Sequence, residues 1–549
     1  MSPQRTFATI ATNSTYGRAG DGVLVGRMIA NTAFIEALGK YSKFDRFRFY
    51  IGEHADEATI QKLFGNSLAD RIEIRNLLHL EQDFSAADFT AMHYGAHLDR
   101  FGDLTWLRDR YATKNIPITG QIHSLSYPRS LNDYMRFYLL PPRETDAILC
   151  STESGKRVVE NSLNELRESL RAKGTEMSAL QCEMPVIPLG IDAKTLQGGD
   201  GAKLRSELDI PSQAFCALAL ARFSEFDKMD LFPLLLAFRG VVERMDRPAI
   251  LLLAGARQGT KTPEMIQLWA RALGIESNLR FMTDFPEVRK PDVLAAADVF
   301  VSPTDNVQET FGITVIEAMA AGLPPIVADF DGYRESVTED VGIRIPTHWS
   351  PPSSELCNLG PLLNERPLHL FLGQGVTVDG EAMEQALFSL GADAELRAKF
   401  SSAARERAEQ RYDWSQVIPQ YEALVDRLAS KSFTPGEHVG PDSSHPLAYR
   451  FEEIFAHYPT TMQAPDRTLV TSAHGRKLSE ARATPPIYPE LTNLFDEVMV
   501  SAALLGAGAP IPANVLAAAV TENFPNHPLW QSEFLLAWMQ KQGLLDQVS

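Results

Sequence analysis

Two glutamates eight residues apart, Glu309 and Glu317, flank the start of a predicted helix. The sequence around them predicts a strand from residue 299, a loop, a helix over about 312–321 and a second strand over 326–328. Backbone N–H groups at a helix start lack intrahelical partners and attract phosphate. A carboxylate just outside the helix can accept hydrogen bonds from two sugar hydroxyls at once. The arrangement suits a nucleotide sugar, with the helix start on the diphosphate, one carboxylate on the sugar and Glu317 on the ribose.

The wider run is less generic than two glutamates on an amphipathic helix, which would otherwise be the simplest interpretation. It reads Ser302-Pro303, Glu309-Thr-Phe-Gly312, Glu317-Ala-Met-Ala-Ala-Gly322-Leu-Pro324 and Asp331-Gly332 followed by Glu335. This run resembles the donor-site signature of the family-four retaining glycosyltransferases, which have the GT-B fold. The resemblance implies that Phe311, Gly312, Ile313 and Glu317 bind the donor, and that Glu309 contacts the transferred sugar.

Two cations, Arg222 and Lys228, follow a strand predicted at 217–221. A diphosphate leaving group gains negative charge as its bond to the sugar breaks, and fixed cations can stabilise it without a metal. Their spacing resembles the Gly-Arg…Lys element of the same family, although Ala221 and Met229 stand where that family has glycine. Two surface cations on a loop are the alternative. Their place after a strand and upstream of the acidic signature favours a catalytic role.

His123 ends the run Ile118-Thr-Gly-Gln-Ile-His123, at the expected carboxyl tip of a strand in the first half of the chain. Members of the resembled family often have a histidine here, which contacts the sugar or lines the acceptor side. The resemblance therefore implies that His123 belongs to the catalytic site. A lone histidine also fits a strand cap or a core imidazole.

The loop after the first strand contains Gly17, Gly20 and Gly22, whose spacing differs from a Rossmann fingerprint. Its position is that of the N-terminal glycine loop in the resembled family. Glycine lets the backbone approach a phosphate or sugar where a Cβ would collide. The resemblance thus implies that Gly20 and Gly22 contribute to donor binding.

His93 and His97 are four residues apart, a spacing that on one helix would present two imidazoles to a metal. However, His93 is predicted at a strand end, and no Glu-bearing zinc motif accompanies the pair. The resembled enzymes are also metal-independent. We therefore expect no metal, and no cofactor beyond the nucleotide-diphosphate sugar that serves as substrate.

The chain has 549 residues with 52 Lys and Arg against 70 Asp and Glu, a formal charge of −18. Nucleic-acid binding depends on clustered Lys and Arg, so a nucleic-acid partner is disfavoured. The four cysteines have neither a close pair nor metal-like spacing, which favours reduced thiols. No signal peptide and no apolar stretch of spanning length is recognisable. We expect a cytoplasmic protein, either free or peripheral to the inner face of a membrane.

Strand-like and helix-like runs alternate along the chain, as parallel α/β sheets require. The sequence predicts an N-terminal Rossmann-like, acceptor-side domain over 1–195 and a nucleotide-sugar-binding Rossmann-like domain over 196–411, facing a cleft. In the resembled family a segment ending in Tyr-x-Trp crosses back to the first domain. Tyr412-Asp413-Trp414 matches it, so a crossover helix over about 412–430 is expected. Residues 432–549 lie outside the resemblance and indicate a linker and a mostly helical extension, which we expect to recruit an acceptor, a membrane or a protein partner.

Together these features indicate a retaining, metal-independent glycosyltransferase that moves a sugar from a nucleotide-diphosphate donor to a hydroxyl of a glycan, lipid or other glycoconjugate. The resemblance implies front-face departure, in which the leaving phosphate helps to deprotonate the acceptor. A nucleotide-sugar epimerase or sugar phosphorylase on the same fold is one alternative. A non-catalytic scaffold that binds partners through its extension is another, although the complete set of donor-site charges disfavours it.

Overall fold

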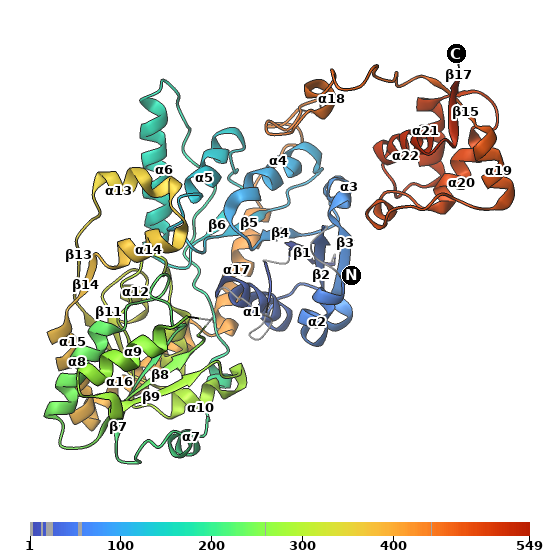
Figure 1. The fold of residues 1–549 in the computed structure, drawn as a ribbon. Coiled ribbons are helices and arrows are strands. Elements are labelled where there is room, and N and C mark those ends of the chain that lie inside the picture. Colours follow the sequence, from blue (N-terminus) through green and yellow to red (C-terminus); the bar gives the residue numbers. More distant parts are fainter. Residues whose placement is uncertain are drawn as a thin grey trace. The chain divides into compact units, whose positions relative to one another are not determined.

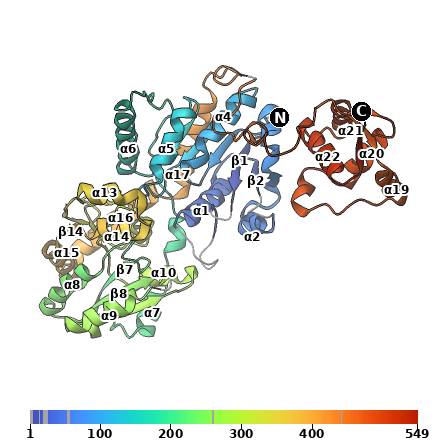
Figure 2. The same ribbon diagram turned by 45° about the horizontal axis from the view of Figure 1, so that its top comes forward.

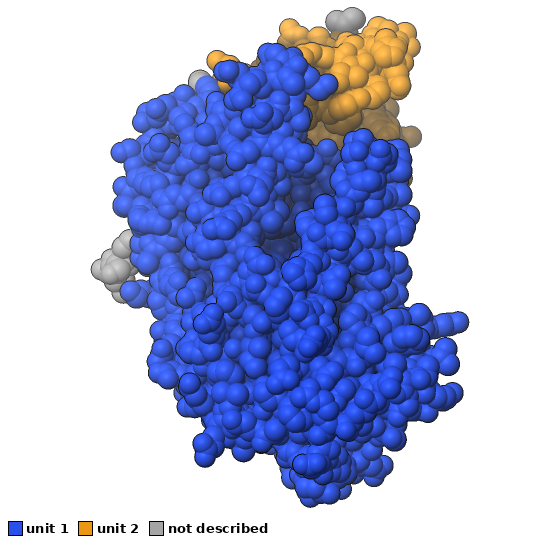
Figure 3. Space-filling view, turned by 90° about the vertical axis from the view of Figure 1, so that its left-hand side faces the viewer, with its two compact units in different colours: residues 1–77, 83–441 blue, residues 78–82, 442–549 orange. Residues whose placement is uncertain are grey.

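The structure, a computed structural model, describes residues 4–12, 15–17, 26–52, 57–257, 260–440 and 442–548. The chain forms two compact units, shown in different colours in Figure 3. Unit 1 comprises residues 1–77 and 83–441, and unit 2 comprises residues 78–82 and 442–549.

Unit 1 contains two parallel sheets, as the sequence predicts (Figure 1), and each sheet has six strands. The first sheet has the order β3-β2-β1-β4-β5-β6, and all its neighbouring strands run parallel. Its strands are β1 (Thr6–Ala11), β2 (Arg46–Ile51), β3 (Ile72–Asn76), β4 (Ala91–Tyr94), β5 (Ile118–Gln121) and β6 (Ala147–Leu149).

Helices join these strands in the alternation expected of a doubly wound sheet. They are α1 (Gly26–Tyr41), α2 (Glu57–Leu68), α3 (Leu80–Ala86), α4 (Phe101–Tyr111), α5 (Ser130–Leu139) and α6 (Glu153–Arg171). One strand, β3, is missing from the sequence prediction because its Ile-Glu-Ile-Arg-Asn segment mixes charged and apolar residues at the sheet edge. Beyond β6, isolated parallel bridges join Ala147 to Glu183 and Cys150 to Val186.

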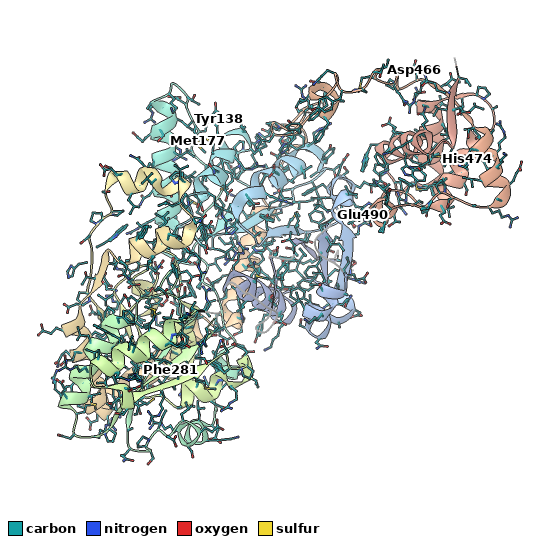
Figure 4. All side chains as sticks on the ribbon, viewed as in Figure 1. Tyr138, Met177, Phe281, Asp466, His474 and Glu490 are labelled. Atoms are coloured by element: carbon teal, nitrogen blue, oxygen red, sulfur yellow. The ribbon has the colours of Figure 1, made fainter. Side chains whose placement is uncertain are left out.

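The second sheet has the order β12-β11-β10-β7-β8-β9 and is also parallel throughout. Its strands are β7 (Phe215–Leu220), β8 (Ala249–Gly255), β9 (Leu279–Thr283), β10 (Val299–Ser302), β11 (Pro325–Ala328) and β12 (Ile343–Ile345). Phe281, labelled in Figure 4, lies on β9 and faces Phe223 with ring centroids 6.3 Å apart. The central strands β7, β8 and β10 are buried along their whole length, which explains their continuous apolar sequences.

The helices of this half of unit 1 fall into two sets. Those associated with the sheet are α7 (Gly201–Glu207), α8 (Phe232–Arg244), α9 (Thr262–Ala272), α10 (Lys290–Ala295), α11 (Ile313–Ala320), α12 (Tyr333–Ser336), α15 (Gly380–Ala392) and α16 (Ala394–Arg411). Between β12 and α15 the chain adds the antiparallel pair β13 (Thr347–Trp349) and β14 (Val376–Val378) with α13 (Ser354–Leu359) and α14 (Glu365–Gly373).

Helix α17 (Trp414–Ala429) follows α16 and packs beside α1 against the first sheet, as both Figure 1 and Figure 2 show. Its Trp414 and Tyr421 belong to the same apolar core as Phe7 and Phe34 of the first sheet and its helices. Asp413 caps the helix by accepting a hydrogen bond from the Ser415 N–H at 2.9 Å. The chain therefore returns to the N-terminal sheet after completing the second one.

Both sheets share one topology, since each starts at a central strand, adds two strands on one side and then three on the other. In such doubly wound sheets ligands bind beyond the carboxyl ends of the strands, where the order reverses. The reversal lies between β1 and β4 in the first sheet and between β7 and β10 in the second. The loops that follow these four strands are consequently the places to look for a site.

Unit 2 combines the predicted helices with a small antiparallel sheet in the order β16-β15-β17. Its elements are α18 (Phe451–Ile454), β15 (Thr468–Thr471), α19 (Ala473–Ala481), α20 (Glu497–Gly506), β16 (Ile511–Pro512), α21 (Ala513–Asn523), α22 (Leu529–Lys541) and β17 (Leu545–Val548). Figure 4 labels Asp466, just before β15, and His474 on α19. The three strands have only two to four residues each, too few for an alternation to stand out in the sequence.

Candidate active site

The loops after β7 and β10 meet at the reversal point of the second sheet and bring two predicted site residues into contact. Lys228 follows β7, Glu309 follows β10, and the Lys228 Nζ lies 3.0 Å from the Glu309 Oε2. Both side chains are largely buried, with 27% of Lys228 and 14% of Glu309 exposed. The structure thus places a cation and a carboxylate, 81 residues apart in sequence, at the position where this topology binds ligands.

The second carboxylate oxygen of Glu309 binds backbone N–H groups of the turn just before α11. Its Oε1 accepts hydrogen bonds from the backbone N–H groups of Thr310, Phe311 and Gly312 at 3.2, 3.4 and 3.1 Å. Burial alone would raise the pKa of Glu309, but the Lys228 ammonium and these N–H donors outweigh it and keep that pKa below its usual range. Glu309 is therefore an anion held by the kind of donors that also bind phosphate.

The residues between Glu309 and α11 have different positions. Gly312 has φ of +84°, and a Cβ added there would lie 2.1 Å from the Tyr333 ring, so the turn requires glycine. The Phe311 side chain is buried in the core with its ring 6.0 Å from that of Tyr412. Only the backbone of Phe311 can therefore face a ligand. Ile313 is the first residue of α11, where N–H groups have no intrahelical acceptor.

Arg222 lies on the same loop as Lys228 but pairs differently. Its Nη1 lies 3.3 Å from the Asp227 Oδ2, and both side chains are 23% exposed. This pair joins two residues of the loop, five positions apart. The structure thus brings Arg222 and Lys228 together on one loop, with Lys228 in direct contact with Glu309.

Glu317 has a partner that the sequence gave no reason to expect, Lys290 at the start of α10. The Lys290 Nζ lies 2.8 Å from the Glu317 Oε1, and the side chains are only 15% and 11% exposed. The Glu317 Oε2 is buried and has no hydrogen-bond partner among the described residues. Burial raises the pKa of Glu317 although Lys290 opposes this shift. Glu317 is thus a buried acid with one oxygen that has no hydrogen-bond partner among the described residues.

A further acid, Asp331, lies in the turn after β11. It has a left-handed φ of +41°, uncommon for a residue with a side chain, and its Oδ2 is buried without a hydrogen-bond partner among the described residues. Burial, followed by the charge of Glu309, raises the pKa of Asp331 well above its usual value. Asp331-Gly332 belongs to the sequence run that resembles the donor-site signature, but that resemblance predicted no role for Asp331.

His123 lies two residues beyond β5 and is half-buried. Its Nε2 lies 2.9 Å from the carbonyl oxygen of Gly95, which only accepts hydrogen bonds, so Nε2 carries the proton and Nδ1 has the free lone pair. Burial, with the charge of Arg27, lowers the pKa of His123 to about 3. The imidazole is therefore neutral at physiological pH. Gly20 and Gly22 lie outside the described residues.

His93 and His97 do not share a helix face. His93 lies within β4 with its Nδ1 2.9 Å from the Thr119 Oγ1, and burial lowers its pKa to about 3. His97 follows the strand, and its Nε2 lies 3.3 Å from an Arg129 nitrogen. Among the described residues no group of three or more His, Cys, Asp or Glu is placed to hold a metal ion.

Comparison with known proteins identifies the fold. The profile of the family "Glycosyl transferases group 1" matches residues 202–353. Among solved structures, Anabaena Alr3699/HepE in complex with UDP shares 15% identity and a TM-score of 0.53, covering 77% of this chain and all of that one. A glycosyltransferase from Rickettsia africae ESF-5 has 13% identity and a TM-score of 0.54, covering 78% of this chain and all of that one. The fold is therefore GT-B.

Two curated relatives indicate which kind of glycosyltransferase the chain resembles. A D-inositol 3-phosphate glycosyltransferase from Kineococcus radiotolerans is 25% identical over 350 residues, which cover 61% of this chain and 76% of the relative. A phosphatidyl-myo-inositol mannosyltransferase from Mycobacterium leprae is 25% identical over 272 residues, which cover 49% of this chain and 61% of the relative. The chain is thus similar to group 1 glycosyltransferases, enzymes that take their sugar from a nucleotide-sugar donor, and residues 202–353 match the model of that family.

The sequence expectations on membrane spans and cysteines can be compared with the structure. No helix in the part of the chain that the structure describes is long and apolar enough to cross a membrane. All four cysteines are free, with Cys150, Cys182 and Cys216 buried and Cys357 exposed.

Proposed function

We propose that this enzyme moves a hexose from a nucleoside-diphosphate sugar to a hydroxyl acceptor with retention of anomeric configuration. The observation that carries the proposal is the Lys228–Glu309 pair at the reversal point of the second sheet. A cation that can hold a diphosphate and a carboxylate that can hold sugar hydroxyls stand in contact there. A scaffold without activity would not need to keep this pair buried and hydrogen-bonded.

In this proposal each charged group contacts a different part of the donor. Lys228 and Arg222 hold the diphosphate, and the first N–H groups of α11, from Ile313 onward, add hydrogen bonds to it. Glu309 accepts hydrogen bonds from the sugar hydroxyls. The free Oε2 of Glu317 accepts those of the ribose, while Lys290 holds the other oxygen in place.

The reaction then follows from charge development. The bond between the anomeric carbon and the diphosphate oxygen breaks, and the acceptor oxygen attacks the same face of the sugar. The acceptor proton passes to the leaving phosphate, whose negative charge the two cations stabilise. His123, neutral and with Nδ1 as an acceptor, receives a hydrogen bond from a sugar hydroxyl. We propose that no metal is required, so EDTA should leave the rate unchanged.

We also propose functional boundaries that follow this assignment. Residues 1–195 with the helix at 412–430 would form the acceptor-side domain, residues 196–411 the donor domain, and residues 432–549 a partner- or acceptor-recruiting extension. Helix α17 shares an apolar core with the first sheet, which supports assigning residues 412–430 to the acceptor-side domain. The extension forms its own apolar core, which supports regarding it as a separate domain.

A thermal-shift panel of nucleotide sugars tests the proposal, because a ligand that binds only the native state raises the unfolding temperature. UDP sugars come first in the panel, since Anabaena Alr3699/HepE is described in complex with UDP. Acceptors should include inositol phosphates, because both curated relatives are named for inositol-bearing acceptors. Transfer of labelled sugar with retention supports the proposal. Epimerised donor, or release of sugar phosphate from a glycan, would indicate instead the alternative reactions on this fold.

A further inference from the structure

One side chain, Gln308, connects the two halves of unit 1 next to the proposed catalytic residues. Its Nε2 donates to the Ser124 Oγ at 2.7 Å and to the Tyr127 hydroxyl at 2.9 Å. Its Oε1 accepts from the Ser126 Oγ at 2.6 Å. Both hydrogens of the amide and its oxygen are therefore used on three hydroxyls, all from a single loop that follows β5 of the first sheet.

The two loops that Gln308 joins are the ones that carry His123 and Glu309. Ser124 follows His123 directly, and Glu309 follows Gln308 directly. His123 and Glu309 belong to different sheets, so the backbone of neither half fixes the distance between them. A hydrogen-bonded link one residue away from each would fix that distance. The Gln308 backbone N–H is itself held by the Asn306 Oδ1 at 3.0 Å, which limits movement of the loop on the Glu309 side.

Other hydrogen bonds also join the two halves of unit 1. The Glu335 carboxylate accepts from the backbone N–H groups of Glu153 and Ser154 at 2.8 and 2.9 Å, at the start of α6. The Thr152 hydroxyl donates to the Thr310 carbonyl oxygen at 3.0 Å. These bonds also hold the halves together, one of them through Thr310 next to Glu309, but among the described residues it is Gln308 that joins the Glu309 loop to the loop that carries His123.

The loop that follows β5 is also held in place by a second set of contacts, besides those with Gln308. Helix α14, which lies beyond residues 202–353 that match the family profile, contacts this loop. The His369 ring lies 5.3 Å from the Tyr127 ring, and Glu365 lies 3.6 Å from Arg129. The Tyr127 ring is thus packed against His369 of the other half of unit 1, and its hydroxyl accepts the hydrogen bond from Gln308.

We propose that Gln308 is a positioning residue that sets the spacing between His123 and Glu309 across the two sheets, so that transfer occurs only when the halves are closed. The proposal rests on the donor-site roles proposed above. Gln308 touches no reacting atom and acts through Glu309. Its loss should therefore lower the rate of the bound complex rather than donor binding, because the diphosphate cations and Glu317 lie within one half.

The kinetic test compares Gln308→Leu with Gln374→Leu, a matched control whose amide donates to Asp230 within the same half at 3.0 Å. For Gln308→Leu we expect kcat to fall about 10- to 100-fold, the cost of a misplacement on the order of 1 Å, while the calorimetric affinity for donor changes less than about threefold. The control should keep normal kcat. A Gln308→Leu enzyme with normal kcat, or with kcat and donor affinity reduced equally, would overturn the proposal.

A double-mutant cycle with Tyr127→Phe separates positioning from a general loss of stability. Tyr127→Phe keeps the ring packing and removes one of the three hydroxyls. If Gln308 acts through this loop, the double variant should be scarcely slower than Gln308→Leu alone. Strictly multiplicative losses in kcat would show that the two side chains act independently and would contradict the link.

A distance measurement tests the link without relying on turnover. Spin labels at Asn161 on α6 and Leu268 on α9, both exposed, report the separation of the halves in a Cys357→Ser background, since Cys357 is the exposed cysteine. We expect a narrow distance distribution that broadens to longer distances in Gln308→Leu and not in Gln374→Leu. An unchanged distribution in Gln308→Leu would count against the link even if the unaltered chain turned over no nucleotide sugar, a result that would separately refute the proposed function.

Discussion

The Glu309 and Glu317 ends of one short segment have opposite electrostatic surroundings. Glu309 is bound by Lys228 and three backbone N–H groups, and its pKa is lowered. Glu317 is bound by Lys290 through one oxygen, the other oxygen has no partner in the part of the chain that the structure describes, and the pKa of Glu317 is raised. The difference arises from exposure to donors, because the turn before α11 offers free N–H groups whereas the helix interior does not.

This difference implies two modes of donor binding. Glu309 now contacts groups that would bind a diphosphate, so a donor has to share or exchange Lys228 with it. Glu317 already has an oxygen available, and a ribose hydroxyl would complete its hydrogen bonding without displacing Lys290. Substitutions at the Glu309 end should therefore affect the chemical step, and substitutions at the Glu317 end should affect binding.

The largest effect is expected at Lys228. Lys228→Ala removes the cation nearest to Glu309 and should lower kcat for transfer by about 100- to 1000-fold, the range for loss of one charge-stabilising group. The unfolding temperature should fall only modestly, because three backbone N–H groups still hold the Glu309 carboxylate. The exposed Lys203→Ala is the control and should retain full activity. Near-normal turnover by Lys228→Ala would remove Lys228 from the catalytic site.

A smaller effect, and of a different kind, is expected at the other end. Glu317→Ala should weaken nucleotide affinity by about 10- to 100-fold, as loss of one or two hydrogen bonds to a charged group implies, with kcat at saturating donor nearly preserved. Isothermal calorimetry with the free nucleotide measures this directly. Glu406→Ala, an exposed glutamate on α16, serves as the helix control. Unchanged affinity in Glu317→Ala would make the two ends equivalent and refute the ribose assignment.

The turn that separates the two ends can be tested by stability. Gly312→Ala places a Cβ at positive φ and against the Tyr333 ring, so the free energy of unfolding should fall by at least about 1–2 kcal/mol. Gly380→Ala, where a new Cβ meets nothing within 4 Å, should be neutral or slightly stabilising. Urea unfolding of the two variants measures both. Equal stability for Gly312→Ala and the unaltered protein would show that this turn can relax.

The smallest effect concerns pH and a third acid of the same segment, Asp305. Burial raises its pKa to about 8, although it accepts the Asp230 N–H through both oxygens. The folded state therefore holds a proton that the unfolded state releases near pH 4, so this contribution to stability is full below pH 4 and is lost as pH rises toward 8. Asp305→Asn should flatten the decline in unfolding temperature between pH 5 and pH 8. An identical slope in both proteins would mean that Asp305 is ionised in the folded state.

Much of the donor half could be predicted from the sequence because its signals are local. The strand, turn and helix around Glu309 and Glu317 lie in about thirty consecutive residues, and the apolar strands β7, β8 and β10 are continuous runs. The alternation of elements predicted two parallel sheets, and the resemblance to glycosyltransferases predicted the fold. Both predictions are confirmed.

The remaining features depend on contacts between distant residues. Lys290 and Glu317 are 27 residues apart, and Gln308 contacts hydroxyls more than 180 residues earlier, so no spacing rule identifies either. The strand β3 is half polar at a sheet edge, which hides its period. The roles of Arg222, Lys228, Glu309 and Glu317 stay predictions, since geometry gives their neighbours and not their ligands.

The most direct test of the account uses Glu309→Gln. In the proposed function, Glu309 holds the sugar hydroxyls and competes with the diphosphate for Lys228. Calorimetry with the nucleoside diphosphate selected by the thermal-shift panel should therefore show binding at least as tight as in the unaltered enzyme, while transfer falls about 100-fold or more. Transfer at the normal rate, or a loss of diphosphate affinity as large as the loss of transfer, would contradict it.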